Sequence, residues 1–386
     1  MNTIRIYETD SHARQLQARV LSCEESENGW LVELDRTIFY PTGGGQPCDT
    51  GTLGGADVTE TFLRGETVLH RCTAALPAGA DVTGEIDWAR RLDLMQQHSG
   101  EHLVSGLIHA RFGYENVGFH LGADLVTIDF NGEVDEQALQ ELERAANEAV
   151  WADFAPHIWY PEPDELARLS YRSKLELTED VRIVEIGNID CCACCAPHVA
   201  HTGEIGVIKI FTAERHRGGV RVTLLCGMDA LDDYRRRQDS AAEISQLLSV
   251  PRGEIAPAVR RVLDELARLK ERLAETSREL VTARAAAQSF TDGNICVFDS
   301  TLDDIALREL VNLLMEKCTG FAAAFSGSDE AGYKYIIGSR HIDLRKAARD
   351  INAAIGGRGG GRPEMIQGSA SETKEIIQKF VENVHV

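Results

Sequence analysis

Residues 87–103, DWARRLDLMQQHSGEHL, decide how the sequence is divided, because the residue pattern changes there from strand-like to helical. Side chains recur at helical spacings at Leu94, His98, His102 and Leu103. We therefore predict a helix that starts near Asp87. The two histidines stand four positions apart, so both imidazoles project from one face of that helix and can hold a single ion.

The sequence before this helix has a β-rich pattern. Short alternating stretches, such as Trp30–Leu34 and Val68–Cys72, are separated by glycine-rich turns. We predict a small, β-barrel-like domain over residues 1–88. Residues 89–229 add strand-like stretches at 125–130, 181–186, 205–211 and 220–226 to the helix, which predicts an α+β domain.

Residues 230–290 form a predicted helical arm. Two helices, 230–248 and 258–288, are separated by the breaker sequence Val250-Pro251-Arg252-Gly253. The second helix has a coiled-coil-like heptad seam of Val259, Val262, Leu266, Leu269, Leu273, Thr276, Leu280 and Ala283. The partner of this seam is either the preceding helix or the same helix of a second chain in a homodimer. An arm that only spaces two domains fits the sequence equally well.

The last segment, residues 291–386, has the pattern of a separate α/β domain. Its expected strands are 295–298, 321–326 and 335–338, and a glycine-rich run follows at 356–361. The predicted class of the whole chain is α+β, with a C-terminal α/β domain.

The composition restricts the classes of function. The chain has 386 residues, 43% of them hydrophobic, and no apolar run near twenty residues, so we expect no membrane span. Its start does not have the pattern of a signal peptide, which predicts a cytoplasmic protein. A formal charge of −21 argues against nonspecific affinity for nucleic acid, so any nucleic-acid site must be local.

A second group of metal-ligand residues lies far from the histidine pair. Four of the ten cysteines crowd together as Cys191, Cys192, Cys194 and Cys195. Cys194 and His198 are separated by three residues, and zinc favours thiolate with imidazole. With His98 and His102 they supply four ligands for one Zn²⁺ per chain. On spacing alone, Cys191, Cys192 or Cys195 can take the place of Cys194.

A different zinc enzyme fits the first motif. His98 to His102 also matches the H-x-x-E-H pattern of inverted zinc peptidases, in which Glu101 would be the general base. That alternative needs a carboxylate ligand on a later helix and leaves Cys194 and His198 without a role. Glu101 is a candidate catalytic residue in either scheme.

The segment Phe39–Gly51 contains Thr42-Gly43-Gly44-Gly45-Gln46. Glycines allow the backbone to approach a ligand closely, but an ordinary turn has the same composition. The run matches neither phosphate-binding pattern, G-x-x-x-x-G-K-[ST] or G-x-G-x-x-G.

These motifs, taken in order, resemble a known family. Thr42 to Gln46, His98 to His102, and Cys194 to His198 followed by Thr202-Gly203-Glu204-Ile205-Gly206 are similar to the editing domain of alanyl-tRNA synthetases. The arm and the glycine-rich end resemble the DHH-associated domain that follows it. The chain looks like a freestanding member, an AlaX protein of the long form. It differs in having Cys194-Cys195-Ala196-Pro197-His198 where the family usually has Cys-Gly-Gly-Thr-His, and Glu101 where Thr or Gln is common.

The resemblance implies hydrolysis of the ester between a wrongly attached amino acid and tRNA(Ala), chiefly serine, with glycine as a second candidate. It implies that His98, His102, Cys194 and His198 bind zinc, that Thr42 bonds the serine hydroxyl, and that Gln46 positions the ester. Four protein ligands would close the site so that zinc orients the substrate, whereas three would leave a position for activating water. A noncatalytic tRNA-binding module with structural zinc is the remaining alternative.

Two basic segments are candidate tRNA contacts. Residues 215–221 form a predicted loop with Arg215, Arg217 and Arg221, and Arg358 and Arg362 flank the C-terminal glycines. Both segments can bind phosphates within an acidic chain. A solvated surface explains each of them nearly as well.

Overall fold

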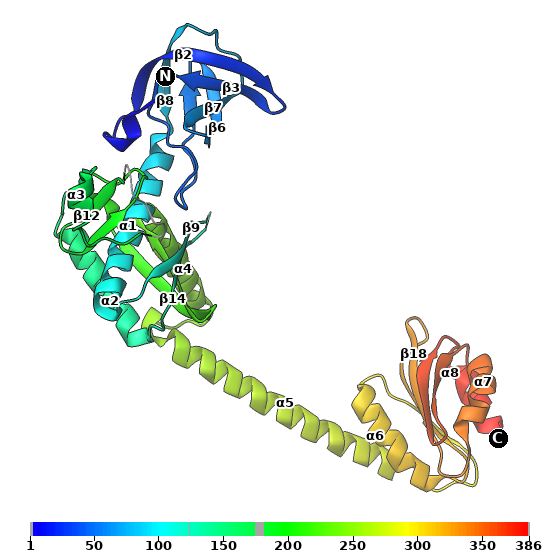
Figure 1. Cartoon of the computed structure of the whole chain (residues 1–386). Coiled ribbons are helices and arrows are strands. Elements are labelled where there is room, and N and C mark those ends of the chain that lie inside the picture. The colour runs from blue at the N-terminus through cyan, green and yellow to red at the C-terminus, as the bar shows by residue number, and fades with distance from the viewer. Residues whose placement is uncertain (1–2, 123, 174–180, 385–386) are drawn as a thin grey trace. The chain divides into compact units, whose positions relative to one another are not determined.

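The computed structural model describes residues 3–122, 124–173 and 181–384. The chain divides into two compact units, Met1–Ala242 and Glu243–Val386 (Figure 1). The predicted segments 1–88 and 89–229 lie in the first unit, and 291–386 lies in the second. The predicted arm, 230–290, is divided between them. Residues 1–2 and 385–386, included in the terminal segments, lie outside the described residues.

The first unit begins with a barrel. Six strands close in the order β2-β3-β7-β6-β5-β8, with antiparallel neighbours. Alternate residues of β2 are buried at Leu16, Ala18 and Val20, as expected for a strand with one face on a core. The strands are β2 (Gln15–Ser26), β3 (Gly29–Leu34), β5 (Gly51–Leu53), β6 (Ala56–Arg64), β7 (Thr67–Cys72) and β8 (Asp81–Ile86). A parallel pair, β1 (Ile4–Arg5) with β4 (Arg36–Thr37), and the 3₁₀ turn η1 (Ile6–Glu8) accompany the barrel.

Helices α1 (Trp88–Phe112) and α2 (Glu136–Trp151) pack on each other and on a four-stranded antiparallel sheet. The sheet has the order β14-β15-β10-β9. Its strands are β9 (Asn116–Leu121), β10 (Val126–Phe130), β14 (Ile208–His216) and β15 (Gly219–Cys226). The strand predicted at 205–211 is shifted, because Ile205 belongs to the 3₁₀ turn η2 (Thr202–Ile205) and β14 continues to His216.

A second sheet holds the cysteine-rich segment. It joins β11 (His157–Trp159), β12 (Ile183–Ile186) and β13 (Asp190–Ala193) in that order, and the short helix α3 (Pro163–Leu166) follows β11 in the chain. Helix α4 (Gly227–Leu247) follows β15.

The second unit contains helix α5 (Ile255–Ala286), preceded by η3 (Arg252–Glu254), and a five-stranded sheet of order β16-β17-β18-β20-β19. Among the described residues of this sheet, only β16 and β17 pair in parallel, so the sheet is mixed. The reason is connectivity: a helix links β16 to β17, whereas β17 and β18 form a hairpin. The elements are β16 (Ile295–Phe298), α6 (Asp304–Leu314), η4 (Met315–Lys317), β17 (Ala322–Ser328), β18 (Gly332–Gly338), α7 (Leu344–Ala354), β19 (Arg358–Arg362), β20 (Met365–Ala370) and α8 (Lys374–Asn383).

The two faces of this sheet pack on different helices. Ala322 and Ala324 of β17 belong to a core with the end of α5 and with α6, whereas Ala323 and Phe325 belong to a core with α7 and α8. The alternation follows from the two-residue period of a strand. The glycine-rich run becomes the edge strand β19, and all five of its residues are exposed.

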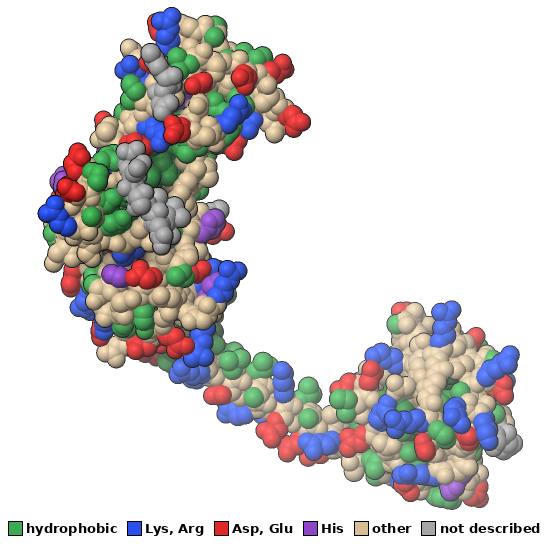
Figure 2. Space-filling model, viewed as in Figure 1, with side chains coloured by type: hydrophobic (Ala, Val, Ile, Leu, Met, Phe, Trp, Pro, Cys, Tyr) green, Lys and Arg blue, Asp and Glu red, His purple; other side chains and the backbone are tan. Residues whose placement is uncertain are grey.

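The predicted seam of α5 is largely exposed within the second unit. Leu266 is 46% exposed, Leu269 53% and Leu273 71%. Figure 2 shows hydrophobic side chains along this helix. Only near its C-terminal end does the helix bury side chains against α6, at Val281 and Ala285. Among the described residues, no helix is long and apolar enough to cross a membrane.

Candidate metal centre and cavity

Helix α1 supplies two of the predicted metal ligands. Its N-cap residue Asp87 accepts a hydrogen bond from the backbone N–H of Arg90, so the helix begins where the sequence predicts. His98 and His102 lie one turn apart, and each is 2% exposed. They therefore face the protein interior together.

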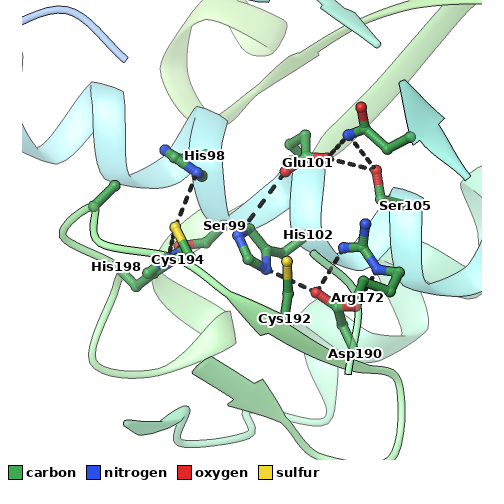
Figure 3. Close-up of polar contacts among 12 residues, drawn as sticks. His98, Ser99, Glu101, His102, Ser105, Arg172, Asp190, Cys192, Cys194 and His198 are labelled. Atoms are coloured by element: carbon green, nitrogen blue, oxygen red, sulfur yellow. Dashed lines mark hydrogen bonds and ion pairs between the residues drawn. The ribbon is translucent and has the colours of Figure 1, made fainter. Parts of the chain in front are cut away.

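The other two predicted ligands meet this pair (Figure 3). One nitrogen of each histidine and the sulfur of Cys194 all lie within 4.8 Å of one another, with His198 as the third histidine. The Cys194 Sγ atom is 3.5 Å from His98 Nε2 and 3.4 Å from His198 Nε2. Three imidazoles and one thiol thus surround a point to which zinc is suited by ligand chemistry.

Each histidine is held by its other ring nitrogen. His98 Nδ1 lies 2.7 Å from Gln46 Oε1, His102 Nδ1 lies 2.7 Å from Asp190 Oδ2, and His198 Nδ1 lies 3.0 Å from Ser99 Oγ. An amide oxygen and a carboxylate can only accept, so Nδ1–H donates in the first two contacts. The Nε2 lone pairs of His98 and His102 are thereby left for a metal, which is the usual arrangement around a zinc site.

Charges within the cluster favour the metal-binding form of the thiol. Burial acts to raise the pKa of Cys194, but His98 and His198 hold it well below its usual value of 9.0. Burial lowers the pKa of His198 to about 3. Burial also acts to lower the pKa of His102, yet its hydrogen bonds to Asp190 and Cys194 hold that pKa well above 6.5. A metal binding at His102 must therefore displace a proton.

Asp190 reaches His102 because of a glycine in α1. A Cβ atom at Gly106 would lie 2.4 Å from the backbone oxygen of Ile189, so only glycine allows the β12–β13 hairpin this close to the helix. Asp190 then accepts a hydrogen bond from His102 with one oxygen. Its carboxylate also forms an ion pair with Arg172, with contacts of 2.7 and 2.9 Å. Neither Asp190 nor Arg172 was among the residues predicted from sequence.

The unusual ligand segment, Cys194 to His198, is fixed by Arg182. This buried guanidinium donates to the carbonyl oxygens of Cys194 at 2.8 Å and Ala196 at 3.0 Å. The backbone N–H of Cys194 donates back to the carbonyl of Arg182 at 3.0 Å. The segment is therefore held in shape by a buried side chain.

The other cysteines of the cluster differ in placement. Cys192 groups with His102 and Asp190, and burial raises its pKa to about 12. Burial raises the pKa of Cys191 to about 11, and Cys195 is exposed. Among the described residues, Cys194 is the cysteine that joins the three histidines.

The glycine-rich loop approaches the same place. Gly43 and Gln46 exchange two backbone hydrogen bonds, which closes a tight turn around Gly44 and Gly45. A Cβ atom at Gly45 would lie 2.7 Å from the ring of Phe119, so the loop packs directly on β9. Thr42 is exposed, and its backbone N–H donates to the carbonyl of Thr61.

A buried ion pair anchors this loop to α1. Asp49, which follows the loop, pairs with Arg91, and the two side chains are 1% and 0% exposed. This ion pair thus fixes the glycine-rich loop relative to helix α1, which carries His98 and His102.

A cavity of about 550 Å³ opens beside three of the four candidate ligands. His98, His102 and Cys194 line it, but Thr42 and Gln46 do not belong to its lining. The remaining lining residues are Gly44, Gly45, Glu101, Glu115, Asn116, Gly118, Phe119, Arg172, Ser173, Val181, Arg182, Cys192, Ala193 and Cys195.

Glu101 is a buried acid in this lining, with an exposure of 4%. Its Oε1 atom accepts hydrogen bonds from Ser105 Oγ at 2.5 Å and from Asn116 Nδ2 at 2.6 Å. Its Oε2 atom lies 4.0 Å from His102 Nε2. Ser105 and Asn116, like Ser99 and Asp190, carry no motif by which the sequence alone would single them out.

The predicted basic loop of the first unit is a β-hairpin, and acids pair with part of its charge. Arg221 lies on β15 and forms two contacts with Asp129, at 2.6 and 2.7 Å. Arg215 lies 3.2 Å from Glu133, and Arg217 occupies the turn between β14 and β15. In the second unit, Arg358 and Arg362 stand at the two ends of the exposed strand β19. Figure 2 shows Lys and Arg side chains over this unit, with acidic ones among them.

Two family models match parts of the chain. Residues 181–222, which include Cys194 and His198, match the threonyl and alanyl tRNA synthetase second additional domain. Residues 292–385 match the DHHA1 domain. The chain thus contains one segment similar to each of these two domain families.

Similarity extends over almost all of the chain. It is 26% identical over 396 residues to the alanyl-tRNA editing protein AlaX-L of Pyrococcus horikoshii, covering 97% of this chain and 96% of that protein. It is also 28% identical to the alanine–tRNA ligase of Pyrococcus abyssi and 30% identical to that of Halobacterium salinarum, but it spans only 43% of the length of each ligase. The predicted resemblance to a freestanding alanyl-tRNA editing protein of the AlaX long form is confirmed.

Among solved structures, the C-Ala domain of Aquifex aeolicus alanyl-tRNA synthetase matches 24% of this chain and 89% of that domain. The identity is 22% and the TM-score is 0.19, which is too low to support a statement about the fold.

Proposed function

We propose that this protein is an editing hydrolase, which cleaves the ester between a wrongly attached amino acid and tRNA(Ala). Serine is the main proposed acyl group and glycine the second. The observation that carries the proposal is the cluster of His98, His102, Cys194 and His198 beside a cavity. The names of the similar proteins, an alanyl-tRNA editing protein and alanine–tRNA ligases, supply the substrate class.

The residues present fit Zn²⁺. Imidazole and thiolate are ligands that zinc prefers, the Nδ1 contacts leave Nε2 of His98 and His102 for an ion, and the cluster favours the thiolate of Cys194. When bound, zinc supplies a Lewis acid that polarises a carbonyl or lowers the pKa of water. Because all four ligand atoms gather together, we favour a closed ligand set and an orienting role.

The protein's own groups then prepare the site for an aminoacyl end. Gln46, Ser99 and Asp190 orient the three imidazoles, so that the cavity presents a fixed wall to the substrate. The cavity volume of about 550 Å³ suits a small ligand, such as an amino acid with part of its ribose. The buried carboxylate of Glu101 faces the same space and is the acidic group that we assign to the reaction.

Thr42 remains our proposed partner for the serine hydroxyl, by resemblance to the family. It directly precedes the turn that packs against Phe119, a residue of the cavity wall. For Gln46, the contact with His98 supports a positioning role through that ligand in place of direct contact with the ester.

The peptidase alternative is less well supported. It needs a carboxylate ligand from a helix that follows the histidine pair. Among the described residues, the acid that groups with either histidine is Asp190, which lies on strand β13 and shares its group with Cys192. The noncatalytic alternative does not account for a cavity beside the ligands.

We propose tRNA contacts at Arg358 and Arg362 ahead of Arg215, Arg217 and Arg221. Both residues of β19 are exposed, and the glycines between them allow a phosphate backbone to approach closely. Arg215 and Arg221 pair with acids of the first unit, which reduces their net charge toward a polyanion. A tRNA substrate also agrees with the predicted cytoplasmic location.

The exposed seam of α5 supports a proposed homodimer. Between residues 259 and 273 the seam has apolar side chains at heptad positions, and a soluble helix rarely leaves such a stripe unpaired. In a parallel pairing, Glu265 would lie opposite Lys270 of the second copy, which gives opposite charges at flanking positions.

A deacylation assay tests the proposed function. Purified full-length protein is incubated with Ser-, Gly- and Ala-tRNA(Ala), and with a casein substrate, before and after chelation. We expect release of serine, its loss with chelator and its return with zinc. Cys194→Ser should abolish the activity, whereas Cys195→Ser, one position away and exposed, is the matched control. Cleavage of casein without cleavage of the tRNA ester would favour the peptidase.

A further inference from the structure

The side chain of Glu101 is an acid in the protein interior. Its carboxylate is almost fully buried, and a buried charge is costly unless a partner compensates it. Oε1 is occupied by two neutral donors, Ser105 and Asn116. Since the Asn116 amide nitrogen can only donate, Oε1 is an acceptor in this network.

The two arginines that line the cavity form the hydrogen bonds described above with groups other than Glu101. Arg172 also lines the cavity, but its guanidinium forms a two-contact pair with Asp190. Arg182 donates to backbone carbonyl oxygens. Among the described residues, the basic group recorded within 4.0 Å of a Glu101 oxygen is His102, whose Nε2 atom belongs to the candidate metal ligands. Among the described residues, no cation forms a hydrogen bond with Oε2, and Glu101 lines the cavity.

We infer that Glu101 binds the α-ammonium group of the aminoacyl ester and thereby restricts the site to esters of amino acids with a free amino group. The inference rests on the proposed function. An aminoacyl-tRNA is a polyanion whose aminoacyl end carries one positive charge, next to the scissile carbonyl. A carboxylate beside the metal ligands matches that charge and orients the carbonyl toward them. N-acylated esters, such as peptidyl-tRNA, lack this charge and would be excluded.

Two other roles for Glu101 make different predictions. A general base would act on the hydrolytic water and would affect turnover of all esters alike, with no effect on which ligand binds. A purely structural acid would hold Ser105 and Asn116, a function that glutamine can also perform because its amide oxygen accepts both hydrogen bonds. Glu101→Gln thus removes the charge while retaining the acceptor.

The test compares binding of two hydrolysis-resistant probes to the zinc-loaded, full-length protein by calorimetry. In the first probe, serine is joined by an amide to 3′-amino-3′-deoxyadenosine; the second is its N-acetyl derivative. We expect the wild type to prefer the free amine by about 10- to 100-fold, the value of a hydrogen bond between charged groups. Glu101→Gln should abolish this preference. The matched control, Glu115→Gln, removes an exposed carboxylate from the same cavity wall and should leave the preference intact.

The binding results either support or overturn the inferred role of Glu101. Equal affinity of the wild type for both probes overturns it, even if the variant fails to fold. A preference retained in Glu101→Gln also overturns it, and retention together with lost turnover identifies a general base. Failure of the proposed function is distinct, because it appears as intact Ser-tRNA(Ala) in the wild-type assay whatever the probes show.

Discussion

Replacing Asp190 with Asn tests whether the contact behind His102 prepares the metal centre. The carboxylate accepts from His102 Nδ1 at 2.7 Å and pairs with Arg172 through contacts of 2.7 and 2.9 Å. Asparagine keeps the size of the side chain but removes its charge, so the imidazole becomes a weaker ligand. Loss of such a partner weakens metal binding by about 10- to 100-fold, or about 1.4–2.8 kcal/mol.

Zinc affinity is measured by competition with a chromophoric chelator at fixed pH. The matched control is Asp129→Asn, because Asp129 also holds an arginine, Arg221, through two contacts, but belongs to no candidate metal group of the described residues. Near-ultraviolet circular dichroism establishes that both variants are folded. An Asp190→Asn affinity equal to that of the wild type would refute our account of how His102 is prepared.

Three further outcomes are expected. Thr42→Val should lower the ratio of seryl- to alanyl-tRNA(Ala) deacylation, since a hydroxyl-binding site can discriminate by roughly 10⁴; an unchanged ratio removes Thr42 from substrate recognition. Leu266→Lys should convert a dimer to a monomer in sedimentation equilibrium, whereas a wild-type monomer contradicts the proposed pairing of α5. Burial lowers the pKa of His70 to about 4, so the unfolded chain binds a proton between pH 6.5 and 4 that the folded chain does not. The free energy of unfolding should therefore fall by about 3 kcal/mol as the pH drops through that window. In the His70→Gln variant, the free energy of unfolding should depend less steeply on pH. The contrary result would be urea-unfolding measurements that give the same pH dependence for both proteins.

Local patterns in the sequence were sufficient to predict the elements in which hydrophobic residues recur with a regular period. The helix at residue 87 was predictable because a capping aspartate precedes an amphipathic repeat, and the spacing of His98 and His102 then fixes a shared face. The barrel strands β3 and β7 differ from the predicted ranges by one residue at their starts, because alternation and turns define them. These features depend on neighbours in the chain.

The four candidate metal ligands were predicted together from their motifs, but other approaches between distant segments were not. Asp190 acts on His102 because Gly106 admits the β12–β13 hairpin, and a single sequence does not reveal which backbone a helical glycine meets. Likewise, Arg221 is a residue of the type that contacts phosphates, but it forms an ion pair with Asp129 on the neighbouring strand. The glycine-rich run at 358–362 lacks the usual composition of a strand, and β20 nonetheless pairs with it along its length.

The guanidinium of Arg182 has a consequence for how the protein can be handled. Besides the carbonyls of Cys194 and Ala196, it donates to the carbonyl of Glu8 at 3.2 Å, and Tyr7 packs with Tyr40 and Ala196. The turn that contains Tyr7 and Glu8 thus packs behind Cys194, although it lies outside the barrel strands. Truncations or affinity tags placed there would leave the barrel strands whole and still loosen the candidate metal centre, so a tag belongs at the other terminus.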